Sequence, residues 1–125
     1  MDGRACPCGL GDDYDACCGR LHAGAPAVTA ESLMRARYSA FAVGDIGYLL
    51  RSWHPSSRPS AFSLDPALQW TRLAVLETQA GGLFDDTGTV QFRAIYVQDG
   101  KRGVHTETSR FLRSDGRWTY LGSIN

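Results

Sequence analysis

The spacing of apolar positions predicts two helices in the first half of the chain. Within residues 30–43, apolar side chains recur at three- and four-residue intervals, which is the spacing of an amphipathic helix. Thr29 can cap the start of this helix, and Gly44 can end it, because glycine readily adopts the left-handed conformation of a helix C-terminus. Asp45 then predicts the cap of a second, short helix over residues 46–53.

From Leu68 onward, the pattern of side chains favours strands instead of helices. Asp99-Gly100 and Asp115-Gly116 are typical two-residue hairpin turns, so the neighbouring strands are expected to pair antiparallel. Residues 20–29 are interpreted as a connector, and the Pro- and Ser-rich stretch 54–67 as an irregular excursion. Helices followed by antiparallel strands give an α+β fold. The expected strands cover residues 68–79, 89–98, 103–113 and 117–124.

The composition indicates one compact domain and argues against two classes of partner. The chain has 125 residues, 43% of them hydrophobic and 21% charged, and 13 basic residues balance 13 acidic ones. Because electrostatic binding to nucleic acid or to an anionic membrane needs a basic excess, neither partner is expected. No apolar run approaches the roughly 18 residues of a spanning helix, and the start lacks the apolar core of a secretory signal. We therefore expect a soluble, cytoplasmic protein.

All of the cysteines are clustered near the start of the chain, between positions 6 and 18. In a cytosolic protein, clustered cysteines bind metal more often than they form disulfides. Four thiolates complete the tetrahedral shell of a Zn²⁺ ion, so the expected site is structural and has no open position for catalysis. The expected zinc ligands are Cys6, Cys8, Cys17 and Cys18.

Two alternatives to this ligand set stay open at the level of the sequence. The four cysteines can instead be free thiols or form disulfides. His22 can also replace Cys18 as the fourth ligand, because an imidazole nitrogen is a common zinc ligand.

The two hairpin turns predict which residues share the core face of the sheet. The turn at Asp99-Gly100 places Phe92 opposite Glu107, and the turn at Asp115-Gly116 places Glu107 opposite Ile124. Directly paired residues lie on one face, and this face is the more apolar one. It is expected to carry Phe92, Ala94, Tyr96, His105, Glu107, Ser109, Phe111, Trp118, Tyr120 and Ile124.

Glu107 needs a partner on this apolar face, because a buried carboxylate is costly unless it is paired. Arg37 lies inside the apolar arc of the first helix and would be buried with it. We therefore expect an ion pair between Arg37 and Glu107 in the interior. Such a pair either joins helix to sheet as a purely structural contact or lines a pocket and orients a ligand.

Three further residues are candidates for the wall of such a pocket: Tyr38, Trp53 and His54. Tyr38 and Trp53 also suit an ordinary core. His54 follows the second helix, where it is either a helix-end residue that the dipole favours or an acid–base group acting with Glu107. His105 is interpreted as a core or rim histidine.

The cysteine-containing segment resembles a known zinc-binding motif. It has the order Cys-x-Cys, eight residues and then Cys-Cys, with Gly9, Gly11 and Tyr14 between the ligands. This pattern resembles the SEC-C motif, a short zinc-binding tail known from the SecA preprotein translocase. The resemblance implies a zinc ion and, because the motif elsewhere serves protein contacts, a protein partner that binds through the loop.

The remainder of the chain carries five segments that match one family in order. These are residues 32–41, Trp53-His54-Pro55, and residues 90–92, 107–111 and 116–120. Together with the cysteine segment they resemble the YchJ family of uncharacterised bacterial proteins. The resemblance implies a SEC-C-like loop over residues 1–22, followed over residues 29–125 by a domain like nuclear transport factor 2. In that cystatin-like cone, helices pack in a curved antiparallel sheet, and a homodimer is expected from the same resemblance.

Two functional hypotheses follow. In the first, the chain is a zinc-binding module that binds a protein partner or a small-molecule ligand. In the second, it is a small-molecule enzyme of the isomerase, dehydratase or hydrolase kind, with an acid–base pocket inside the cone. Because one fold hosts many functions, the resemblance does not decide between them.

Overall fold

The computed structural model describes residues 4–124. Residues 1–3 of the predicted loop (1–22) and residue 125 of the predicted second domain (29–125) lie outside the described residues. Short helical elements come first and four strands follow, which confirms the α+β class. A 3₁₀ turn, Tyr14–Ala16, precedes the helices. The other elements are α1 (Cys18–His22), α2 (Ala30–Val43), α3 (Ile46–Arg51), β1 (Leu68–Ala80), β2 (Thr87–Gln98), β3 (Lys101–Ser114) and β4 (Arg117–Ser123).

The caps of α2 and α3 are those expected from the sequence. The Thr29 hydroxyl accepts a hydrogen bond from the Ser32 amide at 3.0 Å, and Gly44 ends α2 with φ of 82°. The Asp45 carboxylate accepts from the Tyr48 amide at 3.0 Å, which starts α3.

Two helix boundaries differ from the prediction. The helix α3 ends at Arg51 and not at residue 53, because the chain turns there to meet β4: the Tyr120 amide donates to the Ser52 carbonyl at 2.8 Å. The predicted connector 20–29 is wrong in its first three residues. They are helical, because α1 begins at Cys18 and continues through His22.

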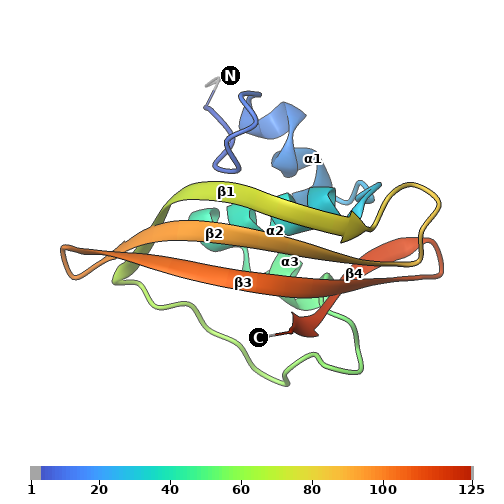
Figure 1. Cartoon of the computed structure of the whole chain (residues 1–125). Helices are drawn as coiled ribbons and strands as arrows, with labels where there is room; N and C mark the ends of the chain where they lie inside the picture. Colours follow the sequence, from blue (N-terminus) through green and yellow to red (C-terminus); the bar gives the residue numbers. More distant parts are fainter. Residues whose placement is uncertain (1–3, 125) are drawn as a thin grey trace.

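The four strands form one antiparallel sheet in the order β1-β2-β3-β4. In Figure 1, α2 and α3 lie behind this curved sheet, and the N-terminal segment lies above it, beyond β1. Asp99 and Asp115 adopt φ of 52° and 53°, and the glycine after each also has a positive φ, as the two predicted hairpin turns require. The pairing of Phe92 with Glu107 is confirmed.

The pairing of Glu107 with Ile124 is wrong. The ladder between β3 and β4 shifts by one residue between Arg110 and Phe111, and beyond this bulge Ser109 pairs with Ser123. The shift leaves Ile124 56% exposed and off the core face on which it was expected.

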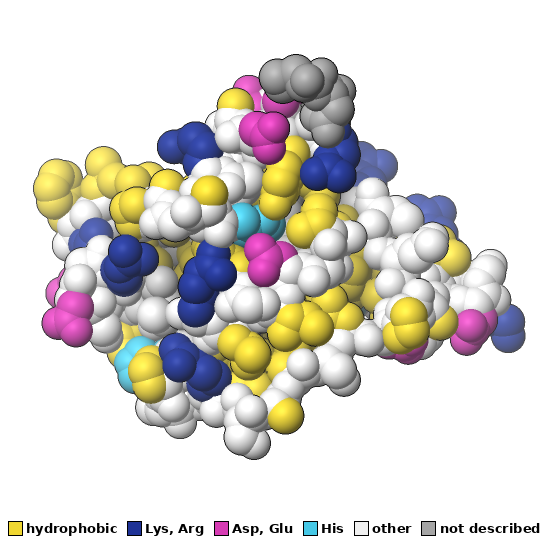
Figure 2. All heavy atoms as spheres, turned by 180° about the vertical axis from the view of Figure 1, so that it is seen from behind, with side chains coloured by type: hydrophobic (Ala, Val, Ile, Leu, Met, Phe, Trp, Pro, Cys, Tyr) yellow, Lys and Arg dark blue, Asp and Glu magenta, His cyan; other side chains and the backbone are white. Residues whose placement is uncertain are grey.

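The core lies between α2 and the concave face of the sheet. Leu33 and Met34 of α2 are buried against Ala94, Phe111 and other residues of the sheet. The same cluster of buried residues continues into the N-terminal segment through Cys6, Cys8, Cys18 and Leu21. Viewed from behind in Figure 2, basic and acidic side chains are scattered among hydrophobic ones, in keeping with a net charge of zero. Among residues 4–124, no helix is long and apolar enough to cross a membrane.

Candidate metal centre and internal cavity

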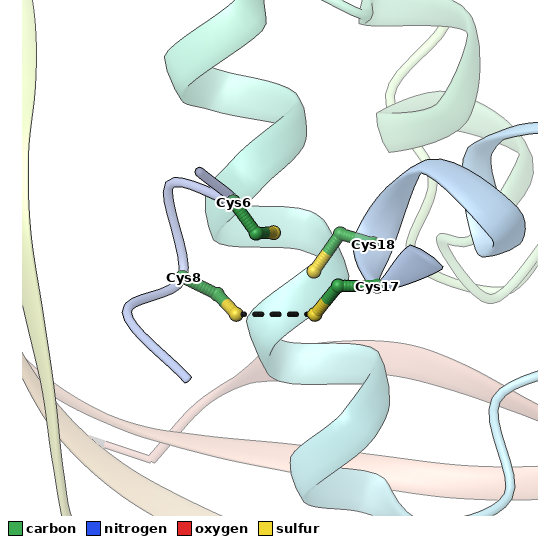
Figure 3. A group of neighbouring side chains, drawn as sticks. All are labelled: Cys6, Cys8, Cys17 and Cys18. Carbon is green, nitrogen blue, oxygen red and sulfur yellow. Dashed lines mark hydrogen bonds between the residues drawn. The ribbon is translucent and has the colours of Figure 1, made fainter. Parts of the chain in front are cut away.

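Four cysteine sulfurs converge beside α2. Cys6 and Cys8 come from the loop on one side, and Cys17 and Cys18 come from the beginning of α1 on the other (Figure 3). All four sulfur atoms lie within 4.8 Å of one another. The loop after Cys8 can turn back sharply because Gly9 has φ of 85°, a conformation that glycine adopts without strain.

The spacing of these sulfurs fits a zinc ion. Zn–S bonds of 2.3 Å in a tetrahedron place neighbouring sulfurs about 3.8 Å apart. The sulfurs of Cys8 and Cys17 are 3.6 Å apart, far longer than the roughly 2.05 Å of a disulfide bond. None of the four cysteines forms a disulfide, so the disulfide alternative is wrong, and free thiols are the alternative to a bound ion. If zinc is bound, Cys6, Cys8, Cys17 and Cys18 would be its ligands and fill its coordination shell, so that its role would be structural.

His22 has other partners and does not join the cysteines. Its Nε2 donates to the Ala36 carbonyl of α2 at 2.8 Å, which leaves Nδ1 to accept from the Tyr14 hydroxyl at 2.5 Å. The alternative in which His22 replaces Cys18 is therefore wrong. The histidine instead links Tyr14 of the loop to α2, and Arg35 of α2 adds a hydrogen bond to the Cys8 carbonyl at 3.0 Å.

Burial and hydrogen bonds among the cysteines shift the pKa values of their thiols in opposite directions. Hydrogen bonding from Cys18 lowers the pKa of Cys8 to about 5, although burial acts in the opposite direction. Burial, together with hydrogen bonding to Cys8, raises the pKa of Cys17 to about 12, and the pKa of Cys18 is also raised, chiefly by its hydrogen bond to Cys8. One thiolate thus forms readily, and a bound metal ion would displace the other protons.

A second feature is a cavity of about 410 Å³ between α2 and the sheet. This volume lies in the range of about 300–1,000 Å³ that is typical of small-molecule sites. Most of the wall is aromatic or aliphatic. The lining residues are Met34, Arg37, Tyr38, Phe41, Trp53, Leu68, Trp70, Phe92, Ala94, Tyr96, Val104, His105, Glu107, Ser109, Phe111 and Tyr120.

Arg37 brings a charged group to this wall. The side chain is only 6% exposed, and its Nη1 donates to the Leu49 carbonyl at 2.8 Å and to the Ser52 hydroxyl at 2.7 Å. The guanidinium carbon lies 4.3 Å from the centre of the Tyr120 ring, a cation–π contact. Burial lowers the pKa of Arg37 to about 10, so the group stays charged at neutral pH.

Glu107 is satisfied by neighbours on its own sheet. Its carboxylate accepts from the Ser109 hydroxyl at 2.6 Å, the His105 ring at 3.0 Å and the Tyr120 hydroxyl at 3.0 Å. Burial alone would raise the pKa of Glu107, but these hydrogen bonds outweigh it and lower the pKa below the usual 4.5.

The expected ion pair between Arg37 and Glu107 is wrong. Among residues 4–124, Arg37 has no ion pair, and Tyr120 lies between the two groups instead, with its ring against Arg37 and its hydroxyl on Glu107. The prediction is wrong because Ser109 and His105, on the same strand and the same face as Glu107, already donate hydrogen bonds to its carboxylate.

Four of the five predicted pocket residues line the cavity, namely Arg37, Tyr38, Trp53 and Glu107. The fifth, His54, is not among the lining residues, and its Nδ1 lies 2.8 Å from the Ser56 hydroxyl. The histidine that reaches Glu107 is His105, which was interpreted only as a core or rim residue. The alternation along β3 carries the signal, because residues 105 and 107 point to the same face.

Comparison with known proteins identifies the family. Residues 29–123 match the family model described as YchJ, middle NTF2-like domain, and residues 5–20 match the SEC-C motif. The chain belongs to the YchJ family. A UPF0225 protein of Streptomyces coelicolor is 53% identical over 92% of this chain and 90% of its own length. One from Corynebacterium efficiens is 50% identical over 95% of this chain and 92% of its own.

Two solved structures share the fold of this YchJ family member. The solution structure of a SEC-C motif containing protein from Rhodopseudomonas palustris is 33% identical, with a TM-score of 0.82, and the match covers 94% of this chain and 95% of that one. The crystal structure of a SEC-C motif containing protein from Psychrobacter arcticus is 27% identical, with a TM-score of 0.76 and coverage of 93% and 79%. The expected curved sheet with packed helices is thereby confirmed.

Proposed function

We propose that this member of the YchJ family is a zinc-stabilised protein that binds a small molecule inside its cone. The observation that carries the proposal is the cavity of about 410 Å³, whose apolar wall is interrupted by a few polar groups. An apolar chamber with a small number of placed polar groups is the usual form of a small-molecule site. A closely packed interior would have contradicted this proposal, because protein cores ordinarily leave few voids larger than a water molecule.

Zinc has a structural role in this proposal. The four cysteines suit the ion, and the loop that carries them packs on α2. The helix α2 also forms part of the cavity wall. A zinc ion that keeps the loop folded would therefore help to fix the position of this wall. The residues of α2 that line the cavity are Met34, Arg37, Tyr38 and Phe41.

The binding proposal is tested by filling the chamber. Ala94 is buried in its wall, so Ala94→Leu should occupy the space that a ligand needs. The probe is 2-naphthamide, a neutral aromatic molecule, titrated into zinc-loaded full-length protein and followed by amide chemical shifts. Saturable shifts at residues 92, 94 and 107 should appear in the wild type and vanish in Ala94→Leu.

The matched control is Thr106→Leu, which adds the same side chain to an exposed position of β3. It should bind the probe like the wild type. Absence of saturable binding to the wild type, or equal binding to Ala94→Leu, would contradict the proposal.

A protein partner that contacts the zinc loop is a second candidate. The exposure of Leu10 favours it, since 57% of this apolar residue is accessible in the loop between the cysteines. Leu10→Asp should release a partner captured by the wild type, while Ala94→Leu should retain it. Retention of the partner by Leu10→Asp would refute a contact at this position.

An acid–base enzyme is also a candidate, and the contact of His105 with Glu107 favours it. The Nε2 atom of His105 donates to this carboxylate at 3.0 Å, which leaves Nδ1 as an acceptor at the cavity wall. Such a pair should catalyse exchange of solvent deuterium into 2-tetralone, an aromatic ketone. His105→Gln should abolish the exchange but not the binding, and a rate equal to that in buffer would exclude this activity for the ketone.

A further inference from the structure

We propose that the cavity selects an apolar molecule that carries a carboxylate group, and that Arg37 binds the carboxylate. The inference rests on the proposed function, because it assigns a chemical class to the ligand of the same chamber. It is carried by the hydrogen-bond donors that the protein leaves without partners in this wall.

Arg37 has more donors than the protein uses. Its Nη1 has two acceptors, but its Nε and Nη2 have no hydrogen-bond partner among residues 4–124. A buried guanidinium without a counter-ion is costly, and ordinary proteins pair it with a carboxylate or a phosphate. The planar arrangement of the two remaining nitrogens suits a carboxylate, which they can bind with two parallel hydrogen bonds.

Two other donors of the lining residues also lack acceptors, those of Trp53 and Tyr38. The Nε1 of Trp53 is buried and has no partner, and the guanidinium carbon of Arg37 lies 5.0 Å from the Trp53 ring. The hydroxyl of Tyr38, whose ring contacts Trp70 on another part of the wall, has no hydrogen bond among residues 4–124. The Trp53 nitrogen is too enclosed for a ligand to reach it in this arrangement, so the donors open to a ligand acceptor are the two free nitrogens of Arg37 and the Tyr38 hydroxyl.

Glu107 does not take the place of that acceptor. Its two oxygens already accept three hydrogen bonds, from His105, Ser109 and Tyr120. It lies near enough to raise the pKa of Arg37 slightly but forms no ion pair with it. A ligand carboxylate would therefore meet Arg37 directly and feel modest repulsion from Glu107.

The remaining wall of the cavity indicates the chemistry of the ligand beyond its carboxylate. Trp70 contacts the rings of Tyr38, Phe41 and Tyr96 at centroid distances of 6.3, 6.1 and 5.4 Å. These rings, with Phe92, give a predominantly aromatic wall. Flat apolar molecules pack well against such a wall. A phosphate ester or a sugar would leave it unfilled and would bring polar groups that find no partners there.

The test compares two probes of one shape. 2-Naphthoate carries a carboxylate where 2-naphthamide carries a neutral amide, and both are titrated into zinc-loaded, full-length wild-type protein by calorimetry. Because hydrogen bonds to charged groups are the stronger ones, the naphthoate should bind about tenfold or more tightly. Glu107→Gln should raise the ratio of naphthoate to naphthamide affinity further, since it removes the negative charge that repels the carboxylate.

Arg37→Gln should remove the preference for naphthoate, so that the two probes bind this variant with similar affinity. The matched control is Arg93→Gln, an exposed arginine on β2, which should keep the preference. Equal affinity of the two probes for the wild type would overturn this inference and leave the proposed function standing. Absence of binding by both probes would refute the proposed function as well. The wild-type comparison decides the matter even if Arg37→Gln does not fold.

Discussion

The cysteine loop and the cone are stabilised in opposite ways. In the loop, four side chains converge until their sulfurs lie within 4.8 Å, so that a single ion can fill the space between them. In the cone, the side chains of α2 and the sheet stay apart and surround about 410 Å³ of space. The residues of the loop therefore suit a metal ion that would hold them together, whereas the cone surrounds its open space without such a cross-link.

This difference follows from the residues that each region buries. Between residues 4 and 22, the buried residues are three cysteines and Leu21. Such a segment cannot remain folded by apolar burial alone, and metal binding is then equivalent to folding. The cone buries Leu33, Leu49, Val90 and Phe111, so it has an apolar core of its own that does not depend on a metal ion.

The largest effect is expected from removing the metal. Chelation of zinc should collapse the amide signals of residues 5–22 into the narrow range of an unfolded chain, because the loop loses its main cross-link. The signals of β2 and β3 should keep their dispersion in the same spectrum. Loss of both sets in one step would contradict the separation of the two regions, and an unchanged loop would show that it needs no metal.

A smaller effect on stability is expected from variants of the cone, and it should differ between the packed core and the cavity wall. Leu49→Ala should reduce the free energy of unfolding by about 2–5 kcal/mol, because this fully buried side chain leaves a cavity in packed surroundings. Phe92→Ala should cost less, although it removes more atoms, because Phe92 already borders the open chamber. Urea unfolding of both variants measures the difference, and a larger loss in Phe92→Ala would show that the chamber is packed in solution.

The attachment of the loop to the cone should depend on His22. His22→Ala removes the hydrogen bonds to Tyr14 and to the Ala36 carbonyl, at a cost of about 1–3 kcal/mol in the free energy of unfolding. The zinc content should not change, because the four cysteines are the ligands. Thermal unfolding and metal analysis of one preparation provide both values, and loss of zinc from this variant would restore His22 as a ligand.

The smallest effect concerns pH. Because the pKa of Glu107 is lowered in the folded state, its ionised form stabilises the protein above the usual pKa of 4.5. This contribution is lost as the pH falls through the lowered value. Glu107→Gln cannot titrate, so the difference in stability between wild type and variant should narrow as the pH drops from 7 to 3. A difference that stays constant over this range would mean that Glu107 is not held ionised by its neighbours.

The local signals in the sequence predicted most of the architecture. The caps Thr29 and Asp45, the hairpin turns and the spacing of the cysteines each depend on residues close together in the chain, and all four features are present. The bulge beside Arg110 carries no such local signal. It moved Ile124 to the surface, because one extra residue in a strand reverses the faces beyond it.

The sequence predicts which residues line the cavity better than it predicts which of them form hydrogen bonds with one another. Four of the five expected pocket residues line the cavity, since helical and strand periodicity assign faces. Periodicity does not assign hydrogen-bond partners: it predicts Arg37 beside Glu107, whereas the acceptors of Arg37 are the Ser52 hydroxyl and the Leu49 carbonyl. The position of His54 after a helix predicts a pocket residue, but its backbone amide bonds to the Tyr120 carbonyl, its Nδ1 contacts the Ser56 hydroxyl, and it does not line the cavity.

The claim that joins the two regions is that one zinc ion holds the loop on the cone. Plasma mass spectrometry of the protein, purified without chelator or oxidant, measures this most directly. The account predicts about one zinc per chain in the wild type and none in Cys6→Ser/Cys8→Ser. Wild-type protein without zinc, or a double variant that keeps it, would contradict the account.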